Sequence, residues 1–173
     1  LALVPDDVIA QETTRRDSAV ALPGVAVTAS RMRGSTLTTP LALSTVSTAA
    51  LRNTSGYGLN DGLGLIPGVL AQSRYGGSDV RIVIRGFGAR GAGDRSNAGT
   101  SRGIRVLIDG IPETEPDGRT SFDQIDLAAA EGIEVIRSNA SALWGNAAGG
   151  VINVLTVPRY DERGLEAQPI FGS

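Results

Sequence analysis

Residues 125–156 read "IDLAAAEGIEVIRSNASALWGNAAGGVINVLT" and contain the clearest succession of secondary-structure signals in the chain. Residues 132–137 (GIEVIR) and residues 151–157 (VINVLTV) are rich in β-branched side chains, which predicts two strands. The segment between them, residues 140–150 (ASALWGNAAGG), predicts a short helix that ends in glycines. A strand, a short helix and a second strand are therefore expected in this order.

The same kinds of signal occur upstream of this stretch. Val80, Ile82 and Ile84 alternate with other side chains, which predicts a half-buried strand. Two more strands are predicted at residues 43–48 (LSTVST) and 103–112 (GIRVLIDGIP), the second containing a turn at Asp109-Gly110, and short helices are predicted at residues 47–51 and 58–69, the second ending at Pro67-Gly68. The predicted fold class is α+β: a small mixed β-sheet with short helices and long loops.

The composition argues against an enzyme. The chain has 173 residues, of which 23 are Gly and only 4% are aromatic, so one domain with a thin core is expected. All 16 basic residues are Arg, and the chain has no His and no Cys. The most common general base and the thiolate nucleophile are therefore absent. We predict no catalytic residues and no cofactor.

The charged residues are segregated along the chain. Residues 74–105 contain seven Arg and two acidic residues, whereas residues 106–134 contain eight acidic residues and one Arg. This division does not form a simple basic face, and we therefore predict no nucleic-acid partner.

One glycine motif suggests nucleotide binding. Residues 86–91 (GFGARG) follow a predicted strand and match the spacing GxGxxG. A dinucleotide site also needs a helix that begins in the glycine loop, and residues 92–103 have no helical pattern. A nucleotide-binding enzyme remains only as an alternative, and the glycines are interpreted as a loop.

An acidic segment suggests calcium binding. Residues 113–118 (ETEPDG) are spaced like the opening of a calcium loop. However, Pro116 lies inside this segment, and Gln124 occupies the position where a bidentate Glu is needed. We therefore predict no metal site.

Four segments together resemble the plug domain of TonB-dependent outer-membrane receptors. They occur in the order and spacing of that family and cover roughly residues 43–156. The segments are GLNDGLGLIPGV (58–69), RIVIRGFGAR (81–90), GIRVLIDGIP (103–112) and the stretch at 125–156. The resemblance implies an outer-membrane location, in which the plug lies inside the receptor's own barrel of about 22 strands. An isolated plug would be periplasmic.

The residues upstream of these segments resemble a TonB box. The box covers Val25, Ala26, Val27, Thr28 and Ala29. An extended, β-branched segment of this kind can add as a strand to the sheet edge of a partner, here the periplasmic domain of TonB. An ordinary linker is the alternative interpretation.

The resemblance also implies a lock between the plug and the barrel. Arg85 and Arg137 match family positions that pair with barrel glutamates, and Glu134 is close in sequence. Alternatively, Arg81, Arg85 and Arg137 form surface salt bridges with carboxylates of the plug. The chain departs from the family pattern at Ser138-Asn139, where Gly-Pro is usual, and at Trp144, where Tyr is more common.

The resemblance implies an anionic substrate, since receptors for iron–siderophore complexes and for pyrroloquinoline quinone have similar sequences. Guanidinium groups bind carboxylates, catecholates and phosphates well. Solvated loop side chains are the alternative. The candidate ligand-binding residues lie in predicted outward loops and are Arg74, Tyr75, Arg90, Arg95 and Arg102.

These interpretations divide the chain into four parts. We expect a flexible leader at residues 1–24, in which residues 1–10 fit the end of a signal peptide, and the TonB box at residues 25–29. The plug is expected at residues 40–158, and residues 159–173 are expected to begin a barrel that this chain lacks. The expected function is a gate for active uptake, opened when TonB pulls on the box. A free-standing periplasmic ligand-binding module is the alternative.

Overall fold

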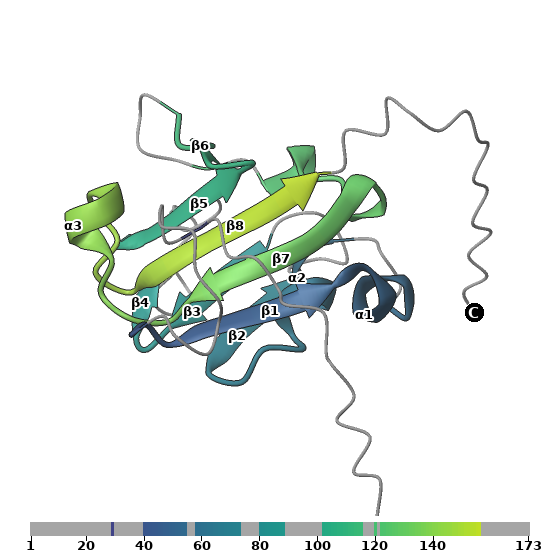
Figure 1. Ribbon diagram of the computed structural model, residues 1–173, viewed down its shortest axis with the longest axis horizontal. Coiled ribbons are helices and arrows are strands. Elements are labelled where there is room, and N and C mark those ends of the chain that lie inside the picture. Colours follow the sequence, from purple (N-terminus) through teal and green to yellow (C-terminus); the bar gives the residue numbers. More distant parts are fainter. Residues whose placement is uncertain are drawn as a thin grey trace, which may run out of the picture.

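The computed structural model contains two β-sheets, with short helices beside them (Figure 1). A five-stranded sheet has the strand order β1-β7-β8-β5-β6, and a three-stranded sheet has the order β2-β3-β4. The part of the chain that the structure describes comprises residues 29, 40–54, 58–73, 80–88, 102–115, 120 and 122–156.

The five-stranded sheet is mixed. Its strands are β1 (Leu43–Ser47), β7 (Ala130–Ile136), β8 (Gly150–Thr156), β5 (Ile104–Ile108) and β6 (Ile111–Pro112). Strands β5 and β8 are parallel, and every other neighbouring pair is antiparallel. Strands β7 and β8 lie in the middle of the sheet, where both edges of each strand are hydrogen-bonded.

The three-stranded sheet is antiparallel throughout. It consists of β2 (Val69–Ser73), β3 (Val80–Ile84) and β4 (Phe87–Gly88). The side chains of β3 alternate between buried and half-buried, as the sequence pattern predicts for a strand that packs one face on a core.

The helices are short. They are α1 (Thr48–Arg52), α2 (Leu59–Leu63) and α3 (Ser141–Trp144), with 3₁₀ turns at Phe122–Gln124 and Leu127–Ala129. None of the helices in the described ranges has the length and hydropathy of a transmembrane segment.

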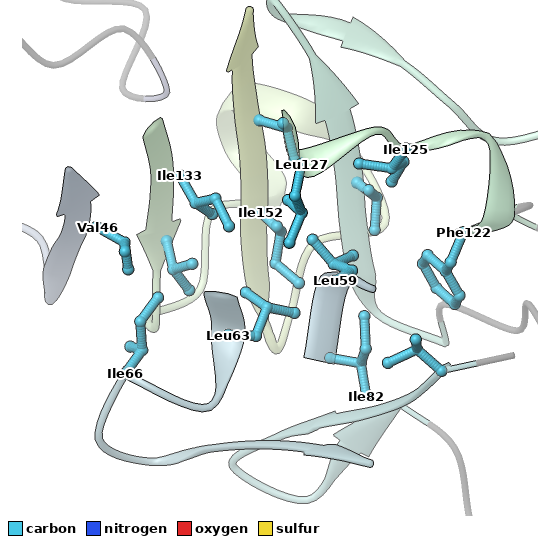
Figure 2. Close-up of a cluster of buried hydrophobic side chains, with 14 of the residues drawn as sticks. Val46, Leu59, Leu63, Ile66, Ile82, Phe122, Ile125, Leu127, Ile133 and Ile152 are labelled. Carbon is cyan, nitrogen blue, oxygen red and sulfur yellow. The ribbon is translucent and has the colours of Figure 1, made fainter. Parts of the chain in front are cut away.

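The main core lies between one face of the five-stranded sheet and α2 with the three-stranded sheet (Figure 2). Leu59 and Leu63 of α2 are fully buried in the same cluster as Ile133 and Ile152. Helix α2 lies close to the sheet because Gly62 has no side chain. A Cβ at this position would lie 2.6 Å from the Cδ1 atom of Ile133.

A second, smaller core lies on the opposite face of the five-stranded sheet. Leu107, Ile136 and Val151 project from β5, β7 and β8 into this cluster, where they meet Trp144 of α3. Ala29 belongs to the same cluster, although it is far away in sequence. This second face therefore connects the N-terminal region to the sheet.

The α+β prediction is confirmed, and the predicted strands at 43–48, 80–85, 103–112, 132–137 and 151–157 correspond to five regions of observed strand. The predicted helix at 58–69 is too long, because α2 ends at Leu63. Residues 69–73 form β2, which the sequence analysis did not predict. Val69 and Ala71 of β2 are half-buried and alternate with the exposed Leu70 and Gln72, but Val69 is the only β-branched residue of the strand, which pairs with β3.

Candidate functional site

The second face of the large sheet holds Ala29 by its backbone. The N–H of Ala29 donates to Glu134 Oε2 at 2.7 Å, and the carbonyl oxygen of Ala29 accepts from Trp144 Nε1 at 2.7 Å. The methyl side chain is completely buried. Ala29 is thus bound at both of its main-chain polar groups by side chains more than 100 positions further along the chain.

Glu134 lies on the central strand β7 and is only 2% exposed. Buried carboxyl groups require hydrogen-bond donors to compensate for lost hydration. In addition to the N–H of Ala29, the Nδ2 group of Asn153 lies 3.4 Å from Glu134 Oε2, from the residue directly opposite on β8. The Oδ1 atom of Asn153 accepts in turn from the N–H of Gly110 in the turn between β5 and β6. A network of hydrogen bonds therefore runs from Ala29 through Glu134 and Asn153 to the turn at Gly110.

Trp144 lies at the end of α3, where Gly145 adopts a positive φ of 60° and ends the helix. The side chain is 9% exposed, and its ring packs in the small core while its N–H reaches Ala29. The guanidinium group of Arg105 donates to the carbonyl oxygen of Trp144 at 3.3 Å through both Nε and Nη2. The packing of the ring in the small core and the hydrogen bonds from Arg105 to the backbone carbonyl therefore both hold Trp144 in place.

Of the predicted TonB box, only Ala29 belongs to the described part of the chain; Val25, Ala26, Val27 and Thr28 lie outside it. Ala29 is attached to the plug sheet through Glu134 and Trp144. Whether the five residues form a TonB box is not tested by this contact and stays a prediction.

The structure brings Arg85 and Arg137 together. Arg85 lies in a turn with a positive φ of 53°, and its Nη1 atom donates to the carbonyl oxygen of Arg137 at 3.2 Å. Nη1 of Arg137 donates to the carbonyl oxygen of Pro67 at 2.8 Å. The buried Nε atom of Arg137 has no hydrogen-bond partner among the described residues.

Glu134, which the sequence analysis grouped with these arginines, projects towards the opposite side of the sheet. Its carboxyl group faces Ala29 in the small core, whereas Arg137 reaches the segment that follows α2. Its place in a plug–barrel lock remains a prediction, and the contact with Ala29 adds a structural role that the sequence analysis did not foresee.

Arg102 is the only candidate ligand-binding residue in the described ranges; Arg74, Tyr75, Arg90 and Arg95 lie outside them. Arg102 is exposed and lines an open cavity of about 600 Å³. Arg85 and Phe87 line the same cavity. Two arginines and a phenylalanine therefore line this cavity, beside the turn between β3 and β4.

No cluster of three or more acidic residues with the geometry of a metal site occurs in the described ranges. The calcium-like segment is only partly described, since Asp117 and Gly118 fall outside those ranges.

Two solved structures have the same kind of fold. The FpvAI–pyocin S2 complex aligns with a TM-score of 0.58 and 22% identity, covering 78% of this chain and 17% of that chain. The ferric citrate transporter FecA in its unliganded form aligns with a TM-score of 0.54 and 24% identity, covering 67% and 17% respectively. These two alignments show the fold alone, and the match to a family model identifies its class as a plug domain.

The chain belongs to a particular family of plugs. The family model described as "TonB-dependent Receptor Plug Domain" matches residues 35–151, which is more than half of the chain. This match confirms the resemblance inferred from the sequence. The relatives are named as transporters and receptors rather than enzymes, so the non-enzymatic class is confirmed, and so is the outer-membrane location of the full-length receptor.

Two curated relatives are named as vitamin B12 transporters. The chain is 29% identical over 157 residues to "Vitamin B12 transporter BtuB" of Vibrio vulnificus, covering 90% of this chain and 23% of the relative. It is 33% identical over 110 residues to the BtuB of Photobacterium profundum, covering 62% and 16%. The chain thus spans less than a quarter of the length of either relative.

The site residues that sequence reasoning missed are Trp144 and Asn153. One signal in the sequence hinted at the site, because Glu134 interrupts the apolar strand GIEVIR and a buried carboxyl there requires partners. The identity of those partners depends on the tertiary structure, since Ala29, Trp144 and Asn153 come from three separate segments.

Proposed function

We propose that this chain is the gate of an active outer-membrane transporter, and that the periplasmic domain of TonB opens the gate by pulling on residues 25–29. Membership of the plug family supports this function. The main support for this function is the attachment of Ala29 to Glu134 and Trp144. Because Glu134 lies on the central strand β7, a force applied to the residues before Ala29 would be transmitted to that strand.

The proposed lock holds the gate in its own barrel through Arg85 and Arg137. The support is the close approach of the two residues and the buried Nε atom of Arg137, which has no acceptor among the described residues. A barrel carboxyl at this place would supply that acceptor. Buried guanidinium groups are stabilised when such a partner is present.

The proposed substrate is anionic, such as an iron–siderophore complex. The cavity lined by Arg85 and Arg102 supports this proposal, because guanidinium groups can bind carboxylates in a bidentate manner. The name of FecA refers to ferric citrate, which is anionic, but the two BtuB relatives are named for vitamin B12. A corrinoid is therefore the second candidate substrate.

The first experiment tests the box. Isothermal titration calorimetry would measure binding of the 173-residue chain to the periplasmic domain of TonB. We expect transient binding in the micromolar range or weaker, because four or five backbone hydrogen bonds at about 0.5–1.5 kcal/mol each contribute about 2–7.5 kcal/mol in total, and a micromolar complex needs about 8 kcal/mol. Val27→Pro removes one donor and fixes φ, so it should abolish this binding.

A matched control is Val20→Pro, which places the same substitution in the predicted leader. This variant should bind like the unmodified chain. Equal binding by the Val27→Pro variant, or no binding by the unmodified chain, would contradict the assignment of the box and leave the plug family membership unchanged.

A further inference from the structure

The cavity beside the turn between β3 and β4 is lined by two positive charges and by no carboxylate. Its lining comes from three segments that are separate in the sequence, namely residues 85–88, residues 102–103, and Asn146 with Ala148. No carboxylate of the described ranges forms an ion pair with Arg85 or Arg102. The two charges are therefore not neutralised by the part of the plug that the structure describes.

Backbone hydrogen bonds hold the three segments together. The N–H of Gly88 donates to the carbonyl oxygen of Arg102 at 3.0 Å, and the N–H of Gly149 donates to the carbonyl oxygen of Gly103 at 2.7 Å. Strands β5 and β8, which begin just after two of these segments, are hydrogen-bonded neighbours. The walls of the cavity are thus fixed by main chain before any ligand arrives, which lowers the entropy lost on binding.

Unusual backbone conformations gather around this cavity. Outside glycine, a positive φ occurs in the described ranges at Arg85, Asp109 and Asn146, and two of these three residues line the cavity. Arg85 is the first central residue of a two-residue hairpin turn, where Gly, Asn or Asp is usual. Strained conformations of this kind cluster at functional sites. The turn alone therefore does not explain an arginine at this position.

The side chains offer many hydrogen-bond donors. Nη1 of Arg85 donates to the carbonyl oxygen of Arg137 at 3.2 Å, and because a guanidinium group has five N–H donors, others remain for a ligand. Arg102 adds a second guanidinium group, and the amide of Asn146 adds N–H donors without charge. Carboxylates and phosphates accept strong, charge-assisted hydrogen bonds from guanidinium groups. This set of side chains is therefore suited to an oxyanion.

We propose that the cavity is an oxyanion-binding site, in which Arg85 and Arg102 supply the charge and Asn146 supplies a neutral donor from the loop after α3. This proposal rests on the proposed uptake of an anionic substrate and adds Asn146 as a binding residue. A carboxylate of the barrel wall offers the same chemistry as a soluble anion. The site is therefore defined by the oxyanion, and its source is decided by experiment.

The first test titrates the 173-residue chain with citrate and follows the backbone amide chemical shifts of Gly86 and Gly103. We expect saturable shifts. Asn146→Gly should bind citrate about 3- to 10-fold more weakly, since one neutral hydrogen bond is lost. This variant should fold, because glycine readily adopts a positive φ. Asn146→Asp has nearly the same size and should bind still more weakly, because it places a carboxylate beside the ligand.

Arg102→Met tests the charge and should weaken citrate binding by about 10- to 100-fold, the range expected for lost hydrogen bonds to a charged group. Its matched control is Arg52→Met, since α1 lies at the other end of the five-stranded sheet (Figure 1). This control should change the affinity by less than about twofold, because salt screens distant charges. Arg85 is left unchanged, because it also belongs to the proposed lock.

Equal citrate affinity of Asn146→Asp, Arg102→Met and Arg52→Met would overturn this site and leave the anionic substrate unaffected. No shift in the unmodified chain would overturn both the site and the anionic substrate. The gate itself is judged separately, by the titration with TonB.

The source of the oxyanion is assigned by comparing citrate binding of the full-length receptor with that of its Asn146→Asp variant. Weaker binding by the variant identifies a soluble anion as the ligand. Equal binding by the two receptors, together with a clear difference in the 173-residue chain, identifies a barrel carboxylate as the group that fills the site.

Discussion

At the scale of single residues, Gly88 explains why a glycine motif occurs in a chain that is not a nucleotide-binding enzyme. Gly88 has a φ of +104°, and a Cβ at this position would overlap the backbone carbonyl oxygen of Ile82 in β3. Gly86 also has a positive φ, of +82°, but no atom lies within 4 Å of its ideal Cβ position. The glycines therefore serve the tight turn between β3 and β4.

Gly88→Ala should consequently be much more harmful than Gly86→Ala. We expect Gly88→Ala to lower the free energy of unfolding by about 2–4 kcal/mol, because the backbone of β3 has to move and the φ is strained. Gly86→Ala should cost only about 1 kcal/mol, from the left-handed conformation alone. Urea denaturation followed by circular dichroism measures both, and equal losses would contradict this explanation.

At the scale of the elements, Asn153 connects two strands and a turn. Its side chain on β8 approaches Glu134 on β7 and accepts from the N–H of Gly110 between β5 and β6. The parallel pairing of β5 with β8 therefore gains a polar contact at the point where β5 ends.

Asn153→Leu has nearly the same size but cannot form these hydrogen bonds. We expect a loss of about 1–3 kcal/mol in unfolding free energy, because Glu134 and the N–H of Gly110 lose a buried partner. Gln72→Leu, an exposed position on β2, is the matched control and should change the stability by less than about 0.5 kcal/mol. A neutral Asn153→Leu variant would show that the polar network contributes nothing to stability.

At the scale of the whole molecule, the lock hypothesis and the salt-bridge hypothesis differ in what they predict for the chain without its barrel. If Arg137 awaits a barrel carboxyl, its replacement by Met removes a partly buried charge whose Nε lacks an acceptor in the described residues. Arg137→Met also removes the hydrogen bond to the carbonyl oxygen of Pro67, so the stability of the isolated chain should fall by about 1–3 kcal/mol, and this loss should be independent of salt. Denaturation at low and high ionic strength measures both quantities.

The opposite result would favour ion pairs within the plug. In that case added salt should reduce the stability loss caused by Arg137→Met, because salt screens exposed ion pairs. Arg52→Met, on an exposed face of α1, is the matched control for the loss of one positive charge.

Local patterns in the sequence were sufficient for most of the fold. Alternation in residues 80–84 and β-branched runs in β1, β5, β7 and β8 predicted those strands, since each packs at least one face on a core. The same reasoning overextended α2 and missed β2, whose residues have little preference of their own. The parallel pairing of β5 with β8 could not be predicted, because it joins segments that are far apart in the sequence.

The candidate site was predictable only in part. The sequence by itself determined the family, the absence of His and Cys chemistry, and the position of a carboxyl group inside an apolar strand at Glu134. Only the tertiary structure decided that this carboxyl faces Ala29, and that the indole N–H of Trp144 donates to the carbonyl oxygen of Ala29. The reason is physical: propensity and periodicity act between near neighbours in the chain, whereas a buried donor and acceptor find each other through packing of distant segments.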